Sequence, residues 1–232
     1  MYRNTMKTIT FSYDDGVTQD QRLVDLFNKY NLKCTFNLNS ALGGTCKLHK
    51  RSGTTFTHGR FDTDEYRRVY QGHEVAVHTL THPNLTTLSK PEIIHQVEKD
   101  RCNLSELVGY DVHGMAYPCG GINNDDRTAE IIKNHTQIKY CRTITNTDSF
   151  NLQDNLFRLN PNVYHILEFE RLMNMGKTFL EMTTEKPQIF YIWGHAYEMD
   201  FHPDYWIKLE EFFEMISCRD DIFYGTNSEV LL

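Results

Sequence analysis

Residues 7–38, KTITFSYDDGVTQDQRLVDLFNKYNLKCTFNL, contain a predicted strand, a predicted helix and a second predicted strand in succession. The run Lys7 to Ser12 is rich in residues that favour strands. Thr18 and Gln21 form a predicted capping box for the helix that follows. The apolar side chains of this helix fall on one face: Leu23, Val24, Leu26, Phe27 and Tyr30. Lys33 to Leu38 predicts the second strand, so the segment is a βα unit that leads into another strand.

The same alternation continues to the end of the chain. Strands are expected at 73–78, 113–117, 139–144, 189–193 and 222–224, and helices at 64–70, 125–134, 168–182 and 204–217, with one more from a Ser89–Glu92 capping box to Gly109. Roughly seven βα units fit 232 residues, which predicts a single domain over residues 1–232 with a closed or nearly closed α/β barrel.

The overall charge and composition exclude several classes of partner. The net charge is -7 and the pI is about 5.9, which argues against nucleic acid because phosphate binding depends on clustered Lys and Arg. No apolar run approaches the roughly 20 residues of a membrane span. Met1 to Lys7 contains no apolar signal region, so we expect a cytoplasmic protein, or an extracellular one if a leader has been removed. The six cysteines are scattered singly, which predicts reduced thiols.

One stretch departs from the βα pattern. Residues 39–60 are rich in Gly, Thr and Ser and have little periodicity, which predicts a long loop. Such a loop could overhang a substrate groove. Several histidines lie outside the motifs described below, and among them we expect His58, in this loop, to lie nearest to substrate. The other histidines of this kind are interpreted as surface or core residues: His49, His73, His113, His165 and His202.

Two adjacent carboxylates follow the first strand in Tyr13-Asp14-Asp15-Gly16. Neighbouring side chains at a strand end project to opposite sides, so one carboxylate can bind a metal while the other faces water or substrate. Asp-Asp-Gly is also a common turn sequence, and a turn without chemistry is the plainer alternative.

A second candidate metal-binding motif is His78-Thr79-Leu80-Thr81-His82-Pro83. Pro83 disfavours the α conformation at His82, so the segment is predicted to run from a strand into a loop, unlike the helix of a metalloprotease. A core histidine plus a surface histidine is the alternative. Together with Asp15, however, the two imidazoles form the three-ligand set with open positions that a catalytic Zn²⁺ or a similar ion requires.

These motifs resemble those of the polysaccharide deacetylase family, the NodB-homology domain of carbohydrate esterase family 4. The resemblance implies a distorted (β/α)7 barrel. Ser12 to Gly16 is similar to the first motif of the family, which implies that Asp14 is the general base and Asp15 a metal ligand. His78 to Pro83 is similar to the second motif, whose two histidines provide the remaining ligands.

The third motif of the family is similar to Met115-Ala116-Tyr117-Pro118-Cys119-Gly120. The resemblance implies that the backbone N–H of Cys119 binds the oxyanion, and we expect Tyr117 and Pro118 to contact substrate. The family usually has an arginine where Met115 stands, and that arginine pairs with the catalytic aspartate. Since methionine cannot do so, the group that tunes the pKa of Asp14 must lie elsewhere.

Trp193-Gly194-His195 resembles the last motif, which implies that His195 is the general acid. Trp193 lies two residues earlier in a predicted strand, so it would face the same side and could stack on a sugar ring, or it could be a core aromatic. The Asp-x-x-Asp-Trp motif of the family has no clear counterpart, only Asp148 followed by Ser149 and Phe150. The group that orients His195 is therefore unassigned by the sequence.

The resemblance implies a metal-dependent hydrolase of non-peptide C–N bonds that removes acetyl groups from N-acetylated sugars or glycans. We expect one divalent cation, with Zn²⁺ favoured and Co²⁺, Ni²⁺ or Mn²⁺ as alternatives, and an N-acylated carbohydrate or a small amide as substrate. Two other functions stay open: a deformylase or cyclic-ureide amidohydrolase on the same fold, and a carbohydrate-binding domain without catalysis.

Overall fold

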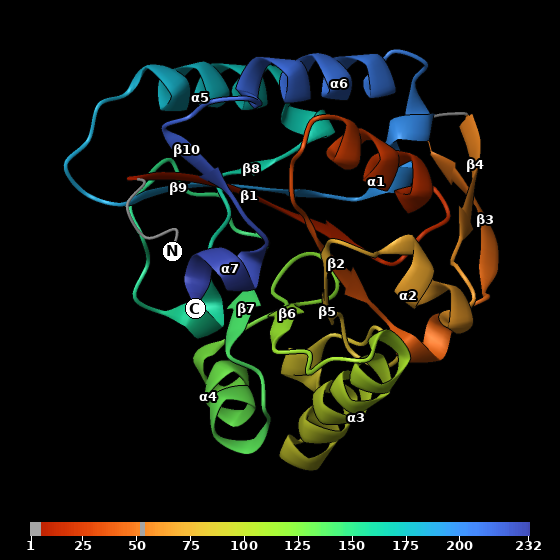
Figure 1. The fold of residues 1–232 in the computed structure, drawn as a ribbon. Helices are drawn as coiled ribbons and strands as arrows, with labels where there is room; N and C mark the ends of the chain where they lie inside the picture. The colour runs from red at the N-terminus through yellow and green to blue at the C-terminus, as the bar shows by residue number, and fades with distance from the viewer. Residues whose placement is uncertain (1–5, 52–53) are drawn as a thin grey trace.

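The computed structural model describes residues 6–51 and 54–232, so most of the N-terminal segment considered for a leader, Met1 to Thr5, lies outside it. Its centre is a curled, parallel, 8-stranded sheet with helices packed around it (Figure 1). The strand order is β7-β6-β5-β2-β1-β9-β8, and β10 pairs with β1. The strands are β1 (Lys7–Asp14), β2 (Thr35–Leu38), β5 (Glu74–Val77), β6 (Gly114–Ala116), β7 (Tyr140–Arg142), β8 (Val163–Tyr164), β9 (Gln188–Gly194) and β10 (Ile222–Tyr224).

Helices α5 and α6 cover one side of the sheet, and α3 and α4 lie on the opposite side (Figure 1). Within the described residues, no helix has both the length and the apolar character needed to span a bilayer. The helices are α1 (Asp20–Lys29), α2 (Tyr66–Val69), α3 (Lys90–Val108), α4 (Asp126–His135), α5 (Phe169–Glu181), α6 (Tyr205–Ile216) and α7 (Asn227–Leu231).

Strand β1 is the central strand, since it pairs with three others. It runs beside β9 over most of its length, while its first half pairs with β10 and its last half with β2. The two outer parts of the sheet are joined by one short segment. Leu159 forms a parallel bridge with Arg142 at the end of β7, and Val163 and Tyr164 pair with β9 a few residues later. The segment 159–164 therefore links the β7 edge to the β9 side and curls the sheet into a barrel.

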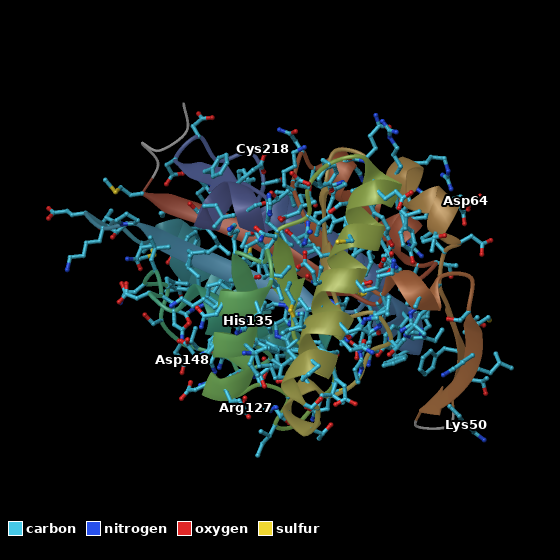
Figure 2. All side chains as sticks on the ribbon, turned by 90° about the horizontal axis from the view of Figure 1, so that it is seen from below. Lys50, Asp64, Arg127, His135, Asp148 and Cys218 are labelled. Atoms are coloured by element: carbon cyan, nitrogen blue, oxygen red, sulfur yellow. The ribbon has the colours of Figure 1, made fainter. Side chains whose placement is uncertain are left out.

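The prediction of a loop at 39–60 is wrong for more than half of the segment. Two strands, β3 (Cys46–Arg51) and β4 (Thr54–Gly59), pair there as an antiparallel hairpin. The hairpin pairs with the chain after β1: the Thr18 N–H donates to Gly59 O at 2.8 Å, and Val17 forms an antiparallel bridge with Arg60. Figure 2 shows Lys50 near the far end of this hairpin, away from the body of the protein. Pairing with distant residues stabilises strands that lack a clear apolar alternation.

The same pairing explains why the predicted cap of α1 is wrong. The helix begins at Asp20 after Gln19, because the backbone of Thr18 is held in the bond to Gly59. The capping box at Ser89 and Glu92 is confirmed, and α3 ends at Gly109 in a left-handed conformation. Two short elements, β8 and α7, were absent from the sequence-based assignment.

Candidate active site

The residues singled out by the motifs lie at the carboxyl ends of neighbouring strands. Asp14 is the last residue of β1, His78 follows β5, and His195 follows β9. Since β1 lies between β2 and β9, and β2 pairs with β5, these ends meet at one mouth of the barrel. This is the edge at which barrels of this architecture place their active sites.

Asp15, His78 and His82 come together as a candidate metal site, with one ligand atom from each within 4.8 Å of the others. The Nδ1 atom of His78 lies 2.9 Å from the carbonyl oxygen of Ala116, so this nitrogen donates and Nε2 is left as the metal-binding atom. Burial lowers the pKa of His78 to about 4 and also lowers the pKa of His82. Both imidazoles are therefore neutral near pH 7, which is the form that binds a metal.

Asp15 is held from the side of the hairpin. Its Oδ2 atom lies 3.2 Å from His58 Nε2, and its Oδ1 atom lies 3.1 Å from Arg60 Nη2. Arg60 Nε also donates to the Asp15 carbonyl oxygen at 2.9 Å. Burial opposes ionisation of Asp15, but the hydrogen bond from His58 and the surrounding histidines outweigh it and hold the pKa well below its usual range. The carboxylate is thus ionised and oriented, as a metal ligand must be.

Asp14 is paired with Arg142, a residue that the motif comparison missed. Arg142 is fully buried, and its Nη2 atom lies 2.6 Å and 2.5 Å from the two oxygens of Asp14. Asn37 Nδ2 also donates to Asp14 Oδ1 at 2.8 Å. Burial opposes ionisation of Asp14, but Arg142, His78 and His195 outweigh it, so the pKa of Asp14 lies below its ordinary value. Arg142 therefore supplies the charge that the sequence left unassigned.

The sheet register explains how Arg142 reaches Asp14. Arg142 on β7 is the partner of Ala116 on β6, whereas Met115 is the partner of Cys141. Because successive side chains alternate between the faces of a sheet, Arg142 shares a face with position 116, and Met115 packs in the hydrophobic core. A side chain at 115 therefore does not reach Asp14, so the expectation that the family's arginine stands at Met115 is wrong, and position 116 is the one that faces the carboxylate. The strand 139–144 was predicted, but no local pattern indicates which of its residues faces Asp14.

His195 is oriented by Tyr164 and Glu198. The Tyr164 hydroxyl donates its one proton to Glu198 at 2.5 Å and therefore accepts from His195 Nδ1 at 2.9 Å. Glu198 lies 3.5 Å from His195 Nδ1 and 3.2 Å from His165 Nε2. Tyr164 and Glu198 thus fill the orienting role that the sequence left unassigned, and His165 helps to position Glu198. Position 198 is only three residues beyond His195, but nothing in the sequence marks it.

The charge of Glu198 controls the pKa of His195. Burial lowers this pKa, but the hydrogen bond and charge of Glu198, with further contributions from Asp14 and Asp15, raise it to about 9. His195 is therefore protonated at neutral pH. Its Nε2 atom lies 3.9 Å from Asp14 Oδ2, so a proton donor faces a proton acceptor.

A Glu198→Gln variant is expected to lower the pKa of His195 by about 1 to 3 pH units, because the neighbouring negative charge that favours the imidazolium is lost. His195 would then lose its proton at a lower pH. NMR titration of the His195 imidazole in metal-free protein measures this change directly. Glu185→Gln, which removes the charge of an exposed glutamate, is the control. An unchanged His195 titration in Glu198→Gln would contradict the assigned role of Glu198.

The loops around the site have strained backbone. Asp15, Thr79, His82 and Cys119 have φ values of 85°, 67°, 61° and 69°, which are unusual for residues other than glycine. The turn at Cys119 is held by Asn123, whose Nδ2 atom donates to the carbonyl oxygens of Tyr117, Pro118 and Cys119 at 3.3, 3.0 and 2.8 Å. Strain of this kind persists only where surrounding contacts enforce it, and it is concentrated at functional sites.

The three residues predicted to contact substrate are buried. Trp193 is 7% exposed, with Tyr164 stacked at 4.4 Å between ring centroids and the Arg142 guanidinium 4.5 Å above its ring, so too little of the ring is accessible to stack on a sugar. Tyr117 is 1% exposed and its hydroxyl donates to Phe157 O at 2.9 Å. Pro118 is buried as well. Contact of these side chains with substrate therefore stays a prediction, and in this structure they pack within the protein.

The mouth of the barrel thus gathers an aspartate and two histidines, a set that could hold a metal ion, beside a carboxylate–imidazole pair. The sequence model of the polysaccharide deacetylase family matches residues 2–137, more than half of the chain. The chain belongs to this family. The matched range ends before Arg142 and His195, which the structure brings beside Asp14.

Curated relatives match over about half of the chain. Peptidoglycan-N-acetylglucosamine deacetylase PgdA of Listeria monocytogenes is 28% identical over 122 residues, which are 51% of this chain and 23% of that protein. A bifunctional xylanase/deacetylase of Pseudobutyrivibrio xylanivorans is 27% identical over 119 residues, which are 51% of this chain and 17% of that protein. The matched stretch therefore spans less than a quarter of either relative.

Solved structures confirm the predicted barrel. A CE4 family pseudoenzyme from Bacillus anthracis has a TM-score of 0.58 and 17% identity, covering 100% of this chain and 67% of that chain. The peptidoglycan deacetylase PdaC from Bacillus subtilis has a TM-score of 0.56 and 17% identity, covering 98% and 90%. At this level of identity the likeness establishes the fold alone.

Proposed function

We propose that this chain is a metal-dependent hydrolase of non-peptide C–N bonds that removes acetyl groups from N-acetylated sugars or glycans. The observation that carries the proposal is the pair of Asp14 and His195 beside the Asp15–His78–His82 cluster. Asp14 has a lowered pKa and His195 a raised one, so one is ready to accept a proton and the other to donate one. A domain that only binds carbohydrate has no use for such a pair.

Asp15, His78 and His82 would hold one divalent cation, for which we propose Zn²⁺, with Co²⁺, Ni²⁺ or Mn²⁺ as alternatives. Two neutral imidazoles and one ionised carboxylate are a donor set that suits catalytic zinc. When bound, such a cation lowers the pKa of water and polarises the carbonyl of the substrate. The hydrogen bond from His78 Nδ1 to the Ala116 carbonyl oxygen fixes the imidazole in one tautomer, as hydrogen bonds to metal-binding histidines commonly do.

The protein's own groups then complete the reaction. Asp14 accepts a proton from the attacking water while the water oxygen adds to the acyl carbon. When the C–N bond breaks, His195 gives its proton to the departing nitrogen, and the products are a carboxylic acid and a free amine. The Cys119 N–H is proposed to stabilise the oxyanion, a contribution typically worth about 10² to 10³ in rate.

Acetate release tests this proposal. Metal-free protein is reloaded with Zn²⁺ and incubated with chitooligosaccharides or peptidoglycan fragments, whose acetyl groups are N-linked, and separately with acetylated xylan, whose acetyl groups are esters and which therefore tests C–O cleavage. We expect acetate from at least one N-acetylated substrate, and loss of this activity with a chelator or in Asp14→Asn. Formate or ureide turnover in parallel assays would favour the alternative amidohydrolase. Saturable glycan binding without any product would favour a binding domain.

A further inference from the structure

An aromatic cluster stands beside the site. It consists of Phe56 on β4 with Tyr197 and Phe201 on the short 3-10 helix η6 (Ala196–Phe201), and we refer to these three residues as the aromatic wall. The rings of Phe56 and Tyr197 are stacked, with centroids 5.6 Å apart and an angle of 3° between planes. Phe56 also contacts Phe201 at 4.6 Å between centroids. The wall thus joins the hairpin to the segment that follows His195.

The aromatic wall lies directly against the groups of the site. The Tyr197 ring is 4.7 Å from the His58 ring and 5.2 Å from the His195 ring, measured between centroids. These separations are direct contacts, so no sugar ring fits between Tyr197 and either histidine. Tyr197 itself is only half-buried, so part of its surface is accessible.

The hairpin is fixed in this position by hydrogen bonds. Gln19 Nε2 donates to Thr57 O at 3.0 Å and to Asp200 Oδ2 at 2.8 Å, so one side chain bridges β4 and η6. His58 on β4 and Arg60, which follows β4, are bonded to Asp15, so β4 is attached both to η6 and to the site. The hairpin could move away from the site only if these contacts were broken.

Access to the reacting groups is correspondingly narrow. The Asp14 side chain is 2% exposed and the Asp15 side chain 8%, while the His195 and His82 side chains are 18% and 30% exposed. A polymer that reacts at an interior residue must extend past the site in two directions. On the side of His58 and His195 the space is filled by the ring of Tyr197, backed by Phe56 and Phe201.

We propose that the aromatic wall closes one end of the substrate groove, so that the enzyme acts on a single N-acylated sugar or on a terminal residue of a chain, with that sugar against Tyr197. This inference rests on the proposed deacetylase function. It adds the substrate class: short or chain-terminal N-acylated sugars, as opposed to the interior of a polysaccharide.

The test locates the freed amine in a defined oligomer. The Zn²⁺-loaded chain is incubated with the tetramer of N-acetylglucosamine carrying an isotope label at its reducing end, and tandem mass spectrometry assigns the deacetylated position. The wild-type protein is expected to react at one terminal residue. In Phe56→Ala and Tyr197→Ala the ratio of terminal to interior product is expected to fall by about tenfold or more, because the smaller side chain no longer prevents an interior residue from binding at the site.

Leu48→Ala is the matched control, because Leu48 lies on the same hairpin, is 74% exposed and is outside the wall. It should keep the wild-type pattern, and thermal unfolding shows whether each variant is folded. Interior products from the wild-type protein would overturn the inference and leave the deacetylase proposal intact, as would an unchanged pattern in both wall variants. No acetate from any oligomer would overturn both.

Discussion

Arg142→Ala is expected to produce a less stable protein whose activity is displaced to higher pH. The variant leaves the Asp14 carboxylate buried without its cation, and breaking a buried ion pair in this way costs about 3–5 kcal/mol. Burial, no longer opposed by Arg142, then raises the pKa of Asp14. The base must be ionised to act. As the pH is lowered, the variant therefore loses activity at a higher pH than the wild-type protein does. Urea unfolding and the acid limb of the kcat/KM profile measure the two effects.

A rescue experiment separates the charge of Arg142 from its position in the sequence. Ala116 is the register partner of Arg142 and shares its face of the sheet, so an arginine at 116 points toward the same carboxylate. Ala116→Arg in the Arg142→Ala background is therefore expected to recover part of the lost activity. Met115→Arg in the same background should not, because position 115 faces the hydrophobic core. Equal behaviour of the two double variants would contradict the register argument.

His78→Ala and Asp15→Ala are each expected to abolish stoichiometric metal binding and with it the activity, because each removes one of the three ligands proposed among the described residues. His195→Ala should bind metal normally and lose rate. Metal analysis after dialysis against Zn²⁺, together with titration calorimetry, distinguishes these outcomes.

His58→Ala is the control for this series, since His58 contacts Asp15 without belonging to the ligand set. Loss of an outer partner typically weakens metal binding by about 10- to 100-fold, less than the loss of a ligand. If His78→Ala kept one tightly bound Zn²⁺, the metal site assigned to this cluster would be wrong.

The sequence was most informative where structure depends on neighbouring residues. The capping box at Ser89 and the strand-to-loop geometry at His82 depend on residues within a few positions, and the structure agrees with both. Thr18 has the same local pattern as Ser89, yet its helix starts later because the hairpin binds its backbone. The hairpin itself has little apolar alternation, so its pairing with the chain after β1 could not be anticipated.

The supporting residues of the site depend on contacts between strands distant in sequence. Arg142 is identified only when the register of β6 and β7 is known, and Tyr164 only when β8 is placed beside β9. The burial of Trp193 and Tyr117, which were expected to contact substrate, could not be predicted for a related reason. Strand alternation indicates which side a residue faces, but it does not indicate how deep that residue lies.

The short connection at 159–164 has a consequence for how the proton-transfer groups behave. It begins beside Arg142, which holds the base, and ends at Tyr164, which holds the acid. The segment therefore contacts both supports, the strand end that carries Arg142 and the tyrosine bonded to His195, and a change that displaces the whole segment is expected to affect the base and the acid together. An insertion or deletion between 159 and 164 should accordingly impair proton acceptance and proton donation at once, whereas Arg142→Ala and Glu198→Gln each act on one group.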